Sequence, residues 1–194
     1  MSSPRYTDFT PTNMTPEQKK VYDDIVAGPR GRIYGPFLVL MHNPGLASAM
    51  QKMGAYVRWG STVPERLKEL AIMCIGRYWG AHVEFSTHAV MAVKAGIDPA
   101  IVAAIEAGTR PDFKSDDEAT IYDFCTSVLE KKGVDDALYA RTLKLLGERG
   151  LIDLMSCYTH YCTISMTLNT FQVPAPEGYK TPSFPHGRAV EGSR

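Results

Sequence analysis

Apolar residues recur at the three- and four-residue spacing of amphipathic helices along most of this chain, and alternating strand-like runs with turn signals are missing. A short apolar turn is expected at 37–42. We therefore expect an all-α fold, a bundle of about seven to eight helices. The pattern predicts helices with these approximate bounds: 15–28, 45–59, 64–79, 81–95, 98–107, 115–132, 134–147 and 149–171.

Local signals mark the starts of three of these helices. Thr15-Pro16-Glu17-Gln18 combines a capping threonine, a proline at the first helical position and a glutamine that can close a capping box. Thr62 and Ser115 stand before acidic residues at similar spacing, so they predict caps of the same kind. Gly80 predicts a break between two consecutive helices.

The predicted helices indicate one domain between two less regular ends. Residues 1–14 form an expected extended, proline-rich arm, residues 15–173 a single helical domain, and residues 174–194 a C-terminal loop or tail. The segment 64–79 is apolar on more than one face, which is typical of a helix at the centre of its domain.

Composition narrows the class of protein. The chain has 194 residues, of which 44% are hydrophobic, and its 21 basic and 21 acidic side chains give zero net charge. No basic run and no apolar stretch of about 20 residues occurs, so neither a nucleic acid nor a membrane is an expected partner. The start lacks the apolar segment of a secretory signal, which favours a cytoplasmic protein. Glycine-rich phosphate-binding motifs are also missing, so no organic cofactor is expected.

The four cysteines are scattered, and no two of them have the two-residue spacing of a redox or zinc motif. We therefore expect buried packing rather than a disulfide framework or a thiolate metal site. The residues are Cys74, Cys125, Cys157 and Cys162.

The most informative stretch for chemistry is 69–88, which places two glutamates and two histidines in an otherwise apolar run. Glu84 and His88 stand one helical turn apart, so their side chains share a face. Such a pair can be a solvated ion pair, part of a metal site, or an acid/base catalyst that moves protons near neutral pH. His82 lies roughly 200° around the helix from Glu84, which disfavours metal binding by both. The spacing alone does not decide between the other two interpretations.

Four segments, in this order, resemble the carboxymuconolactone decarboxylase family over roughly residues 33–173. Each motif is modest by itself, and their order and spacing make the set specific. The segments are Gly35-Pro36-Phe37 with Leu40-Met41-His42-Asn43-Pro44, then Pro64-Glu65-Arg66-Leu67-Lys68-Glu69-Leu70-Ala71-Ile72, then Glu84-Phe85-Ser86-Thr87-His88 with Ala95-Gly96-Ile97, and last Leu151-Ile152-Asp153-Leu154 through Leu168-Asn169-Thr170-Phe171.

This resemblance implies an alkylhydroperoxidase-D-like (AhpD-like) fold and a homo-oligomer, a trimer or a hexamer, with sites near subunit interfaces. In the peroxidase branch of the family, a Cys-x-x-Cys pair precedes a histidine that an upstream glutamate assists. Here Glu69 matches that glutamate and His88 the histidine, whereas the two cysteine positions fall at Ala81 and Glu84. A disulfide cycle at this site is therefore chemically excluded.

Decarboxylation fits the residues that are left, because loss of CO₂ produces an enolate that must be stabilised and protonated. We expect His88 to supply the proton, Glu84 to orient the imidazole or deliver the proton itself, and Glu69 to complete a relay. Four further residues are candidates for binding a small-molecule substrate, each with packing or surface ion pairing as the alternative: Arg66, Arg77, Tyr78 and His42.

The main hypothesis is a cofactor-independent decarboxylase (lyase) or related isomerase acting on a carboxylated lactone or β-keto acid. A thiol-dependent hydroperoxide reductase and a non-catalytic helical oligomer that binds a ligand or protein are the alternatives. Exposure of Glu84 and His88 on an open, solvated face would favour the non-catalytic oligomer. The substrate and the roles of His82 and His160 stay open at this level.

Overall fold

A computed structural model describes residues 4–7, 10, 12–175 and 177–187. Within these residues all regular structure is helical, which confirms the predicted all-α class. A single π-helical turn, η1 (Tyr56–Gly60), follows directly on α3. The α-helices are α1 (Pro16–Ala27), α2 (Phe37–Leu40), α3 (Pro44–Ala55), α4 (Glu65–Tyr78), α5 (His82–Lys94), α6 (Pro99–Ala107), α7 (Asp116–Lys131) and α8 (Asp136–Phe171).

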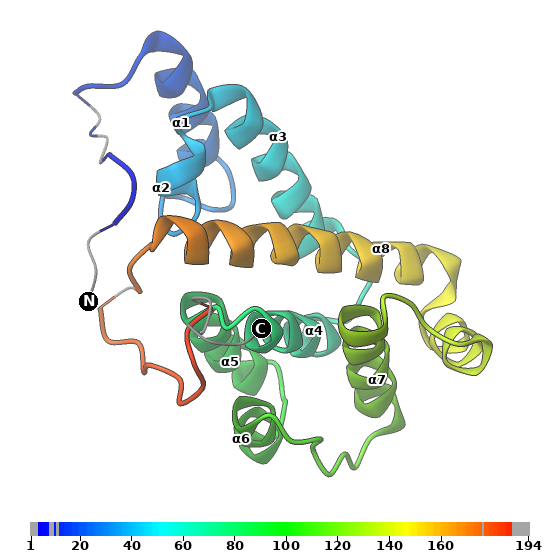
Figure 1. Cartoon of the computed structure of the whole chain (residues 1–194). Helices are drawn as coiled ribbons and strands as arrows, with labels where there is room; N and C mark the ends of the chain where they lie inside the picture. The colour runs from blue at the N-terminus through cyan, green and yellow to red at the C-terminus, as the bar shows by residue number, and fades with distance from the viewer. Residues whose placement is uncertain (1–3, 8–9, 11, 176, 188–194) are drawn as a thin grey trace.

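The long helix α8 runs across the molecule and separates two groups of helices (Figure 1). Helices α1, α2 and α3 lie on one side of it, and α4, α5, α6 and α7 lie on the other. Three clusters of buried apolar side chains fill the interior, two of them around α4 and one among α1, α2 and α3. Because α8 contacts helices on both sides, it joins the two groups.

Helix α4 is the centre of the fold, as its all-round apolar pattern predicts. Every residue from Leu67 to Gly76 is buried, and α4 packs against α5, α7, α8 and α6. Two of these buried residues, Lys68 and Glu69, are charged. Buried charges are tolerated only when they are paired, so the partners of Lys68 and Glu69 bear directly on function.

The three predicted caps have different outcomes. Thr15 forms the expected capping box with Gln18, which confirms that signal. Ser115 is the N-cap residue of α7, as predicted, but neither its side chain nor that of Thr62 makes a capping hydrogen bond, because both have other partners. Thr62 donates its hydroxyl and its backbone N–H to Asp153 on α8, while the Ser115 hydroxyl bonds Asp117.

Two local departures from a regular helix change the predicted boundaries. The single helix predicted at 45–59 ends as the π-helical turn η1, and such turns occur often at functional sites. The two helices predicted at 134–147 and 149–171 meet at Gly147, whose φ of 67° and ψ of 175° interrupt α8.

Two glycines allow close backbone contacts, one between α4 and α5 and the other with the segment 177–187. A side chain at Gly76 would place its Cβ 3.0 Å from the backbone nitrogen of Phe85 on α5. Gly80 ends α4 with a φ of +60°, and a Cβ there would lie 2.7 Å from the backbone nitrogen of Gly187. The lack of a side chain at Gly80 therefore allows both the left-handed backbone conformation and the close contact with Gly187.

The C-terminal segment 177–187 has no helix, and it packs on α5 through backbone carbonyls. His82 bonds the carbonyl of Phe184 at 2.7 Å, and the Ser86 hydroxyl donates to the carbonyl of Lys180 at 2.7 Å. The rest of the predicted tail (176 and 188–194) and part of the predicted arm (1–3, 8–9 and 11) lie outside the described residues.

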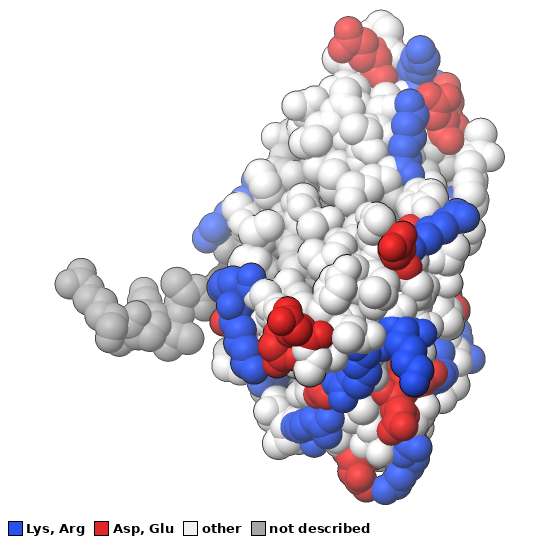
Figure 2. Space-filling model, turned by 90° about the vertical axis from the view of Figure 1, so that its right-hand side faces the viewer, with Lys and Arg blue, Asp and Glu red and all other residues white. Residues whose placement is uncertain are grey.

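The described helices include none that is both long enough and apolar enough to cross a membrane. On the face drawn in Figure 2, basic and acidic side chains lie next to one another, and a larger uncharged area adjoins them. This mixture on one face agrees with the zero net charge of the sequence.

The contact at Gly76 gives a first test of the packing. We expect Gly76→Ala to lower the free energy of unfolding by about 1–3 kcal/mol, because the new methyl group pushes the Phe85 backbone away and separates α4 from α5. Urea denaturation measures this change. Gly45→Ala, in the exposed first turn of α3, is the control: its nearest contact is 3.7 Å away, and we expect no loss of stability. Equal effects of the two substitutions would contradict the close packing of α4 on α5.

Candidate active site

Three buried side chains from α4 and α5 form a continuous carboxylate–imidazole–carboxylate cluster. The Nδ1 atom of His88 lies 2.5 Å from Oε2 of Glu69, and its Nε2 atom lies 3.0 Å from Oε1 of Glu84. Glu69 is fully buried, and His88 and Glu84 are 4% and 6% exposed. Each ring nitrogen of His88 therefore lies beside a carboxylate oxygen.

The helical register explains this arrangement. Glu84 and His88 are one turn apart on α5, so the carboxylate reaches the outer edge of the imidazole. Glu69 is at the middle of α4, which packs directly on α5, and its carboxylate meets the other edge of the ring. The cluster therefore depends on the close contact of α4 and α5.

His88 carries a positive charge in this environment. Burial alone lowers the pKa of His88, but the hydrogen bonds and negative charges of Glu69 and Glu84 outweigh it and raise the pKa to about 9. Burial raises the pKa of Glu69, and the bond to His88 with the charge of Arg58 reverses this, so the net direction is down. At neutral pH the cluster thus holds a proton on His88 between two acceptors.

Arg58 and Tyr161 complete the wall beside the cluster. Arg58, on the π-helical turn η1, has its Nη2 atom 3.8 Å from Oε1 of Glu69 and donates from Nη1 to the Tyr161 hydroxyl at 3.1 Å. The ring of Tyr161 packs edge-on against the ring of His88, with centroids 5.0 Å apart. Lys68 holds the turn in place by donating to the backbone carbonyl of Arg58 at 2.8 Å.

A cavity of about 220 Å³ opens beside His88 and Glu84. It is smaller than the roughly 300–1,000 Å³ of pockets for drug-sized ligands, so it suits a small molecule. The loop before α2, the turn η1, helices α5 and α8 and the C-terminal segment all contribute to its walls. Its charged and polar lining consists of Arg30, Arg32, Arg58, Glu84, Thr87, His88 and His160, and its aromatic lining of Tyr34, Phe37, Tyr161 and Tyr179.

Positive charge dominates the cavity. Three arginines line it, and the proton on His88 adds a fourth positive charge, against the carboxylates of Glu84 and Glu69. Arg30 is held by a bond from its Nε to Gln51 at 2.8 Å and by the ring of Phe37, whose centroid is 4.5 Å from its guanidinium carbon. A cavity with this charge and these fixed guanidinium groups is complementary to a carboxylate.

The structure brings the three predicted catalytic residues together and places the four predicted substrate-binding residues elsewhere. Arg66 pairs with Asp117 at 2.6 Å and with Glu118 on α7. Arg77 and Tyr78 line a separate cavity beside α7. None of these three contributes to the cavity of His88.

His42, the fourth predicted substrate-binding residue, is exposed and lies 2.8 Å from the backbone oxygen of Thr7, at a third cavity. His82 also points away from the cluster, toward Phe184 and His186, whose rings pack on it. Within the described part of the chain, no group of three or more His, Cys, Asp or Glu residues is placed to hold a metal ion.

Sequence reasoning missed the cationic and aromatic lining. Arg30, Arg32 and Tyr34 lie in a loop with no helical periodicity, and Arg58 lies in a turn that the sequence presents as ordinary helix. The one available signal was the sequence Arg30-Gly31-Arg32 between two predicted helices, because two arginines around a glycine in a loop favour binding of an anion.

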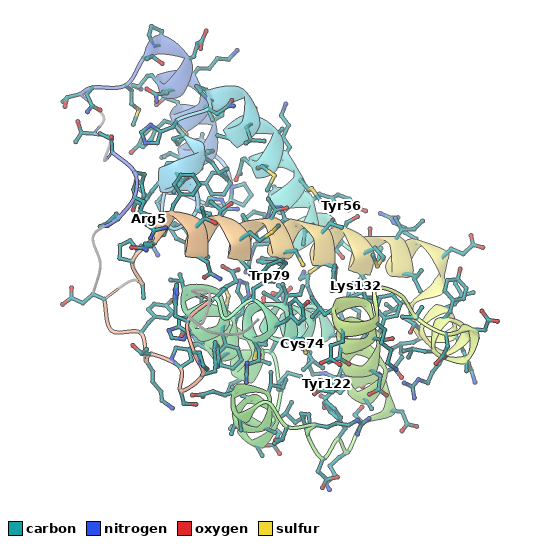
Figure 3. All side chains as sticks on the ribbon, in the orientation of Figure 1. Arg5, Tyr56, Cys74, Trp79, Tyr122 and Lys132 are labelled. Atoms are coloured by element: carbon teal, nitrogen blue, oxygen red, sulfur yellow. The ribbon has the colours of Figure 1, made fainter. Side chains whose placement is uncertain are left out.

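All four cysteines are free thiols, and none of them is among the residues that line this cavity. Cys74, Cys125 and Cys157 are buried, and burial raises the pKa of each thiol above its usual value of 9.0. Cys74 on α4 lies with Tyr122 of α7 at the separate cavity beside α7 (Figure 3). Buried thiols of this kind are packing residues, as predicted.

Several solved structures share this fold. The debrominase Bmp8 in complex with 2,3,4-tribromopyrrole matches with a TM-score of 0.70 and 15% identity, over 90% of this chain and 95% of that chain. The AhpD core of an uncharacterized peroxidase-related protein from Ralstonia eutropha JMP134 matches with a TM-score of 0.70 and 14% identity, over 90% and 93% of the two chains. An uncharacterized peroxidase-related protein from Silicibacter sp. TM1040 matches with a TM-score of 0.67 and 13% identity, over 92% and 95%.

No family profile matches the sequence, and no curated protein matches it significantly. The solved structures nevertheless cover nearly the whole chain, so the chain has the AhpD-like fold that the four sequence motifs implied. At 13–15% identity the likeness shows the fold alone, and function has to be argued from the site.

The charge on His88 gives a second test. Its pKa is about 9 in the fold and 6.5 in an unfolded chain, so the cluster stabilises the protein fully below about pH 6.5 and loses this stabilisation as the pH rises through 9. We expect the difference in free energy of unfolding between wild type and His88→Gln to be largest near pH 6 and to fall by roughly 3 kcal/mol by pH 10.

Denaturant titrations of both proteins at several pH values measure this difference. An NMR titration of the His88 ring, identified by its loss in His88→Gln, reports the pKa directly. A midpoint at or below pH 6.5 would contradict a protonated His88 held between two carboxylates.

Proposed function

We propose that this chain is a cofactor-independent enzyme that transfers protons to and from a small carboxylated substrate, as a decarboxylase (a lyase) or a related isomerase of β-keto acids or carboxylated lactones. The observation that carries the proposal is a protonated His88 between two carboxylates at the wall of a small, arginine-lined cavity. A histidine with a pKa above neutrality stores a proton at the pH of the cell and releases it to a stronger base such as a carbanion.

In this proposal the reaction is a decarboxylation. The bond between the substrate's α-carbon and its carboxylate breaks, CO₂ leaves, and the electron pair of that bond becomes an enolate. The enolate takes one proton at the α-carbon, and the enzyme regains that proton from water. Arginines at the cavity wall bind the carboxylate of the incoming substrate and reduce the energy of the enolate charge.

The two bonds of His88 define the path of the proton. Nδ1 of His88 is hydrogen-bonded to Glu69, and Nε2 lies 3.0 Å from Oε1 of Glu84, so each ring nitrogen has a carboxylate beside it. Glu84 is the partner that also lines the cavity. In this proposal Glu84 passes the proton from Nε2 of His88 to the substrate, while Glu69 holds the imidazole in position and keeps it charged.

Two observations disfavour the alternatives. A thiol-dependent hydroperoxide reductase needs a reactive thiolate, but the cavity has no cysteine in its lining and the buried thiols have raised pKa values. A non-catalytic oligomer would be favoured if the side chains of Glu84 and His88 were solvated. Both residues are instead buried beside a cavity. Among the solved structures of this fold, one is a debrominase and two are peroxidase-related proteins, so enzymes are known on it.

Substitution of the relay tests the proposal. We expect Glu84→Gln and His88→Ala to lower kcat by at least 10²-fold, because each removes a proton-transfer group. The measurement is a screen of carboxylated lactones and β-keto acids in which CO₂ release and product structure are both recorded. Product structure separates decarboxylation from isomerisation.

Glu118→Gln is the matched control. The side chain of Glu118 is 9% exposed and that of Glu84 is 8% exposed, and each carboxylate pairs with a cation, but Glu118 pairs with Arg66 and does not line the cavity. We expect this variant to keep full turnover. If Glu84→Gln and His88→Ala turn over a proven substrate as fast as Glu118→Gln does, proton transfer through this cluster is ruled out.

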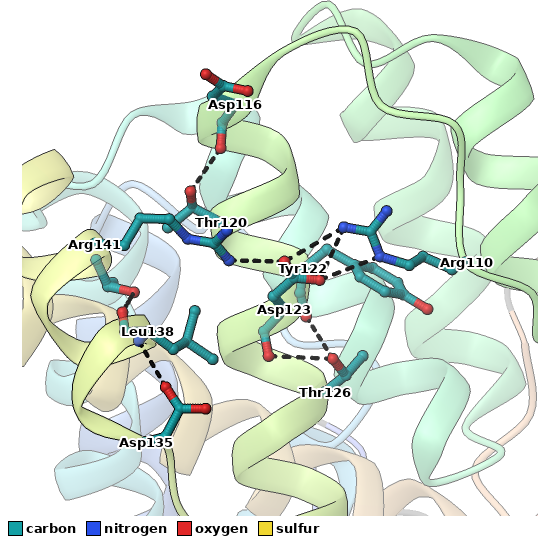
Figure 4. Close-up of polar contacts among 10 residues, drawn as sticks. Arg110, Asp116, Thr120, Tyr122, Asp123, Thr126, Asp135, Leu138 and Arg141 are labelled. Carbon is teal, nitrogen blue, oxygen red and sulfur yellow. Dashed lines mark hydrogen bonds and ion pairs between the residues drawn. The ribbon is translucent and has the colours of Figure 1, made fainter.

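The arginines give a separate test of substrate charge. We expect Arg30→Gln to raise KM for a carboxylate substrate at least tenfold, because it removes a charged hydrogen-bond donor from the cavity. Arg141→Gln is the control, since Arg141 pairs with Asp123 on α7, beside Arg110, outside this cavity (Figure 4). An unchanged KM in Arg30→Gln would contradict a role of this arginine in binding.

A homo-oligomer, trimer or hexamer, and a cytoplasmic location stay predictions from the sequence and its family resemblance. The proposed proton path uses residues of one chain only, so it does not depend on either prediction.

A further inference from the structure

His160 on α8 is a second histidine of the same cavity, and the proton relay does not use it. Its side chain is 4% exposed, and its Nδ1 atom is buried without a hydrogen-bond partner. Leaving a buried polar atom unpaired costs about 1–3 kcal/mol, which a purely structural histidine would avoid by finding a partner. His160 is also one of the residues that line the cavity, so the edge of its ring that faces the cavity can meet a bound molecule.

The surroundings of His160 hold it at this place. Its ring packs edge-on against Tyr161, with centroids 5.2 Å apart, and Tyr161 packs in the same way on His88. Tyr161 thus lies against both imidazoles. On another side of His160 the chain has Gly54, where a Cβ would lie 2.9 Å from Nε2 of His160 and 3.4 Å from Nη2 of Arg30. The absence of a side chain at position 54 leaves the room that both groups occupy.

We propose that His160 is a substrate-binding residue that donates a hydrogen bond from its imidazole to the carbonyl oxygen that becomes the enolate oxygen. The inference rests on the proposed function for the identity of that oxygen, while the hydrogen bond to a bound anion can be tested without turnover. It makes His160 and His88 a pair with different tasks, since one holds the oxygen and the other supplies the proton.

The charge state of His160 fits this task. Burial lowers the pKa of His160 to about 4, and the nearby charges of Arg30 and Arg58 act in the same direction, while Glu84 opposes them. The ring is therefore neutral at pH 7, with one N–H donor. A neutral imidazole donates a hydrogen bond to an enolate oxygen without giving up a proton, so it does not compete with the relay for the protonation step.

The first test uses NMR of protein labelled with ¹⁵N-histidine and oxalate as the probe, because oxalate is a small planar anion that resembles an enolate beside a carboxylate. We expect oxalate to move the ¹⁵N signals of His160 while the ring stays neutral between pH 6 and 8. We expect His160→Gln to weaken oxalate binding about tenfold or more, the usual effect of losing a hydrogen bond to a charged group. His42→Gln, which changes an exposed histidine outside the cavity, is the control and should leave the affinity unchanged.

A second variant tests the position of the ring without removing it. Gly54→Ala places a methyl group 2.9 Å from Nε2 of His160, so the ring must move, and we expect weaker oxalate binding. Gly45→Ala in the same helix is the control, with no contact nearer than 3.7 Å. This variant and the wild-type NMR signals keep the test valid even if His160→Gln does not fold.

On a substrate that depends on Glu84, we expect His160→Gln to lower kcat about 10²-fold, as loss of one oxyanion donor does. Unmoved His160 signals on oxalate binding would overturn the role of His160, and so would full affinity in His160→Gln. Neither result would touch the relay, which fails only if Glu84→Gln keeps full turnover. Moved signals with a tenfold loss of affinity would support the role of His160 whether or not the substrate class is correct.

Discussion

Two carboxylates and an imidazole buried between α4 and α5 determine much of this structure. His88 lies between Glu69 and Glu84, and their hydrogen bonds and negative charges raise its pKa to about 9 against the effect of burial. The arrangement needs the two helices in close contact, and a glycine at 76 allows it. Arg58, on the π-helical turn, adds a second positive charge beside Glu69. Lys68 holds this turn by donating to the backbone carbonyl of Arg58.

The sequence was sufficient to predict the helices, the central place of α4 and the three residues of the cluster. These features are local: a helical pattern defines α4, one turn separates Glu84 from His88, and Glu69 belongs to the same short motif set. The four substrate-binding candidates were chosen for the chemistry of their side chains, and the structure places them outside the cavity of His88. Arg77 is eight residues after Glu69, about 12 Å along a helix, and lines a separate cavity.

The residues that line the cavity could not be predicted in this way. Only tertiary packing brings these residues together, because they come from separate parts of the fold: Arg30 from a loop, Arg58 from the turn η1, His160 from α8 and Tyr179 from the C-terminal segment. The predicted capping hydrogen bonds of Thr62 and Ser115 are absent for a related reason. The Thr62 hydroxyl bonds the distant Asp153, and the Ser115 hydroxyl bonds the nearby Asp117. In the family resemblance Glu84 stands at a cysteine position of the peroxidase branch, so the proposed relay has a carboxylate where that branch has a thiol.

The C-terminal segment has a consequence for how the protein is made. Tyr179 lines a cavity whose other wall begins at Arg30, so the site draws on nearly the whole length of the chain. During synthesis the early helices leave the ribosome long before the segment 177–187 exists. The cavity therefore lacks the wall that Tyr179 supplies until the segment 177–187 has been made.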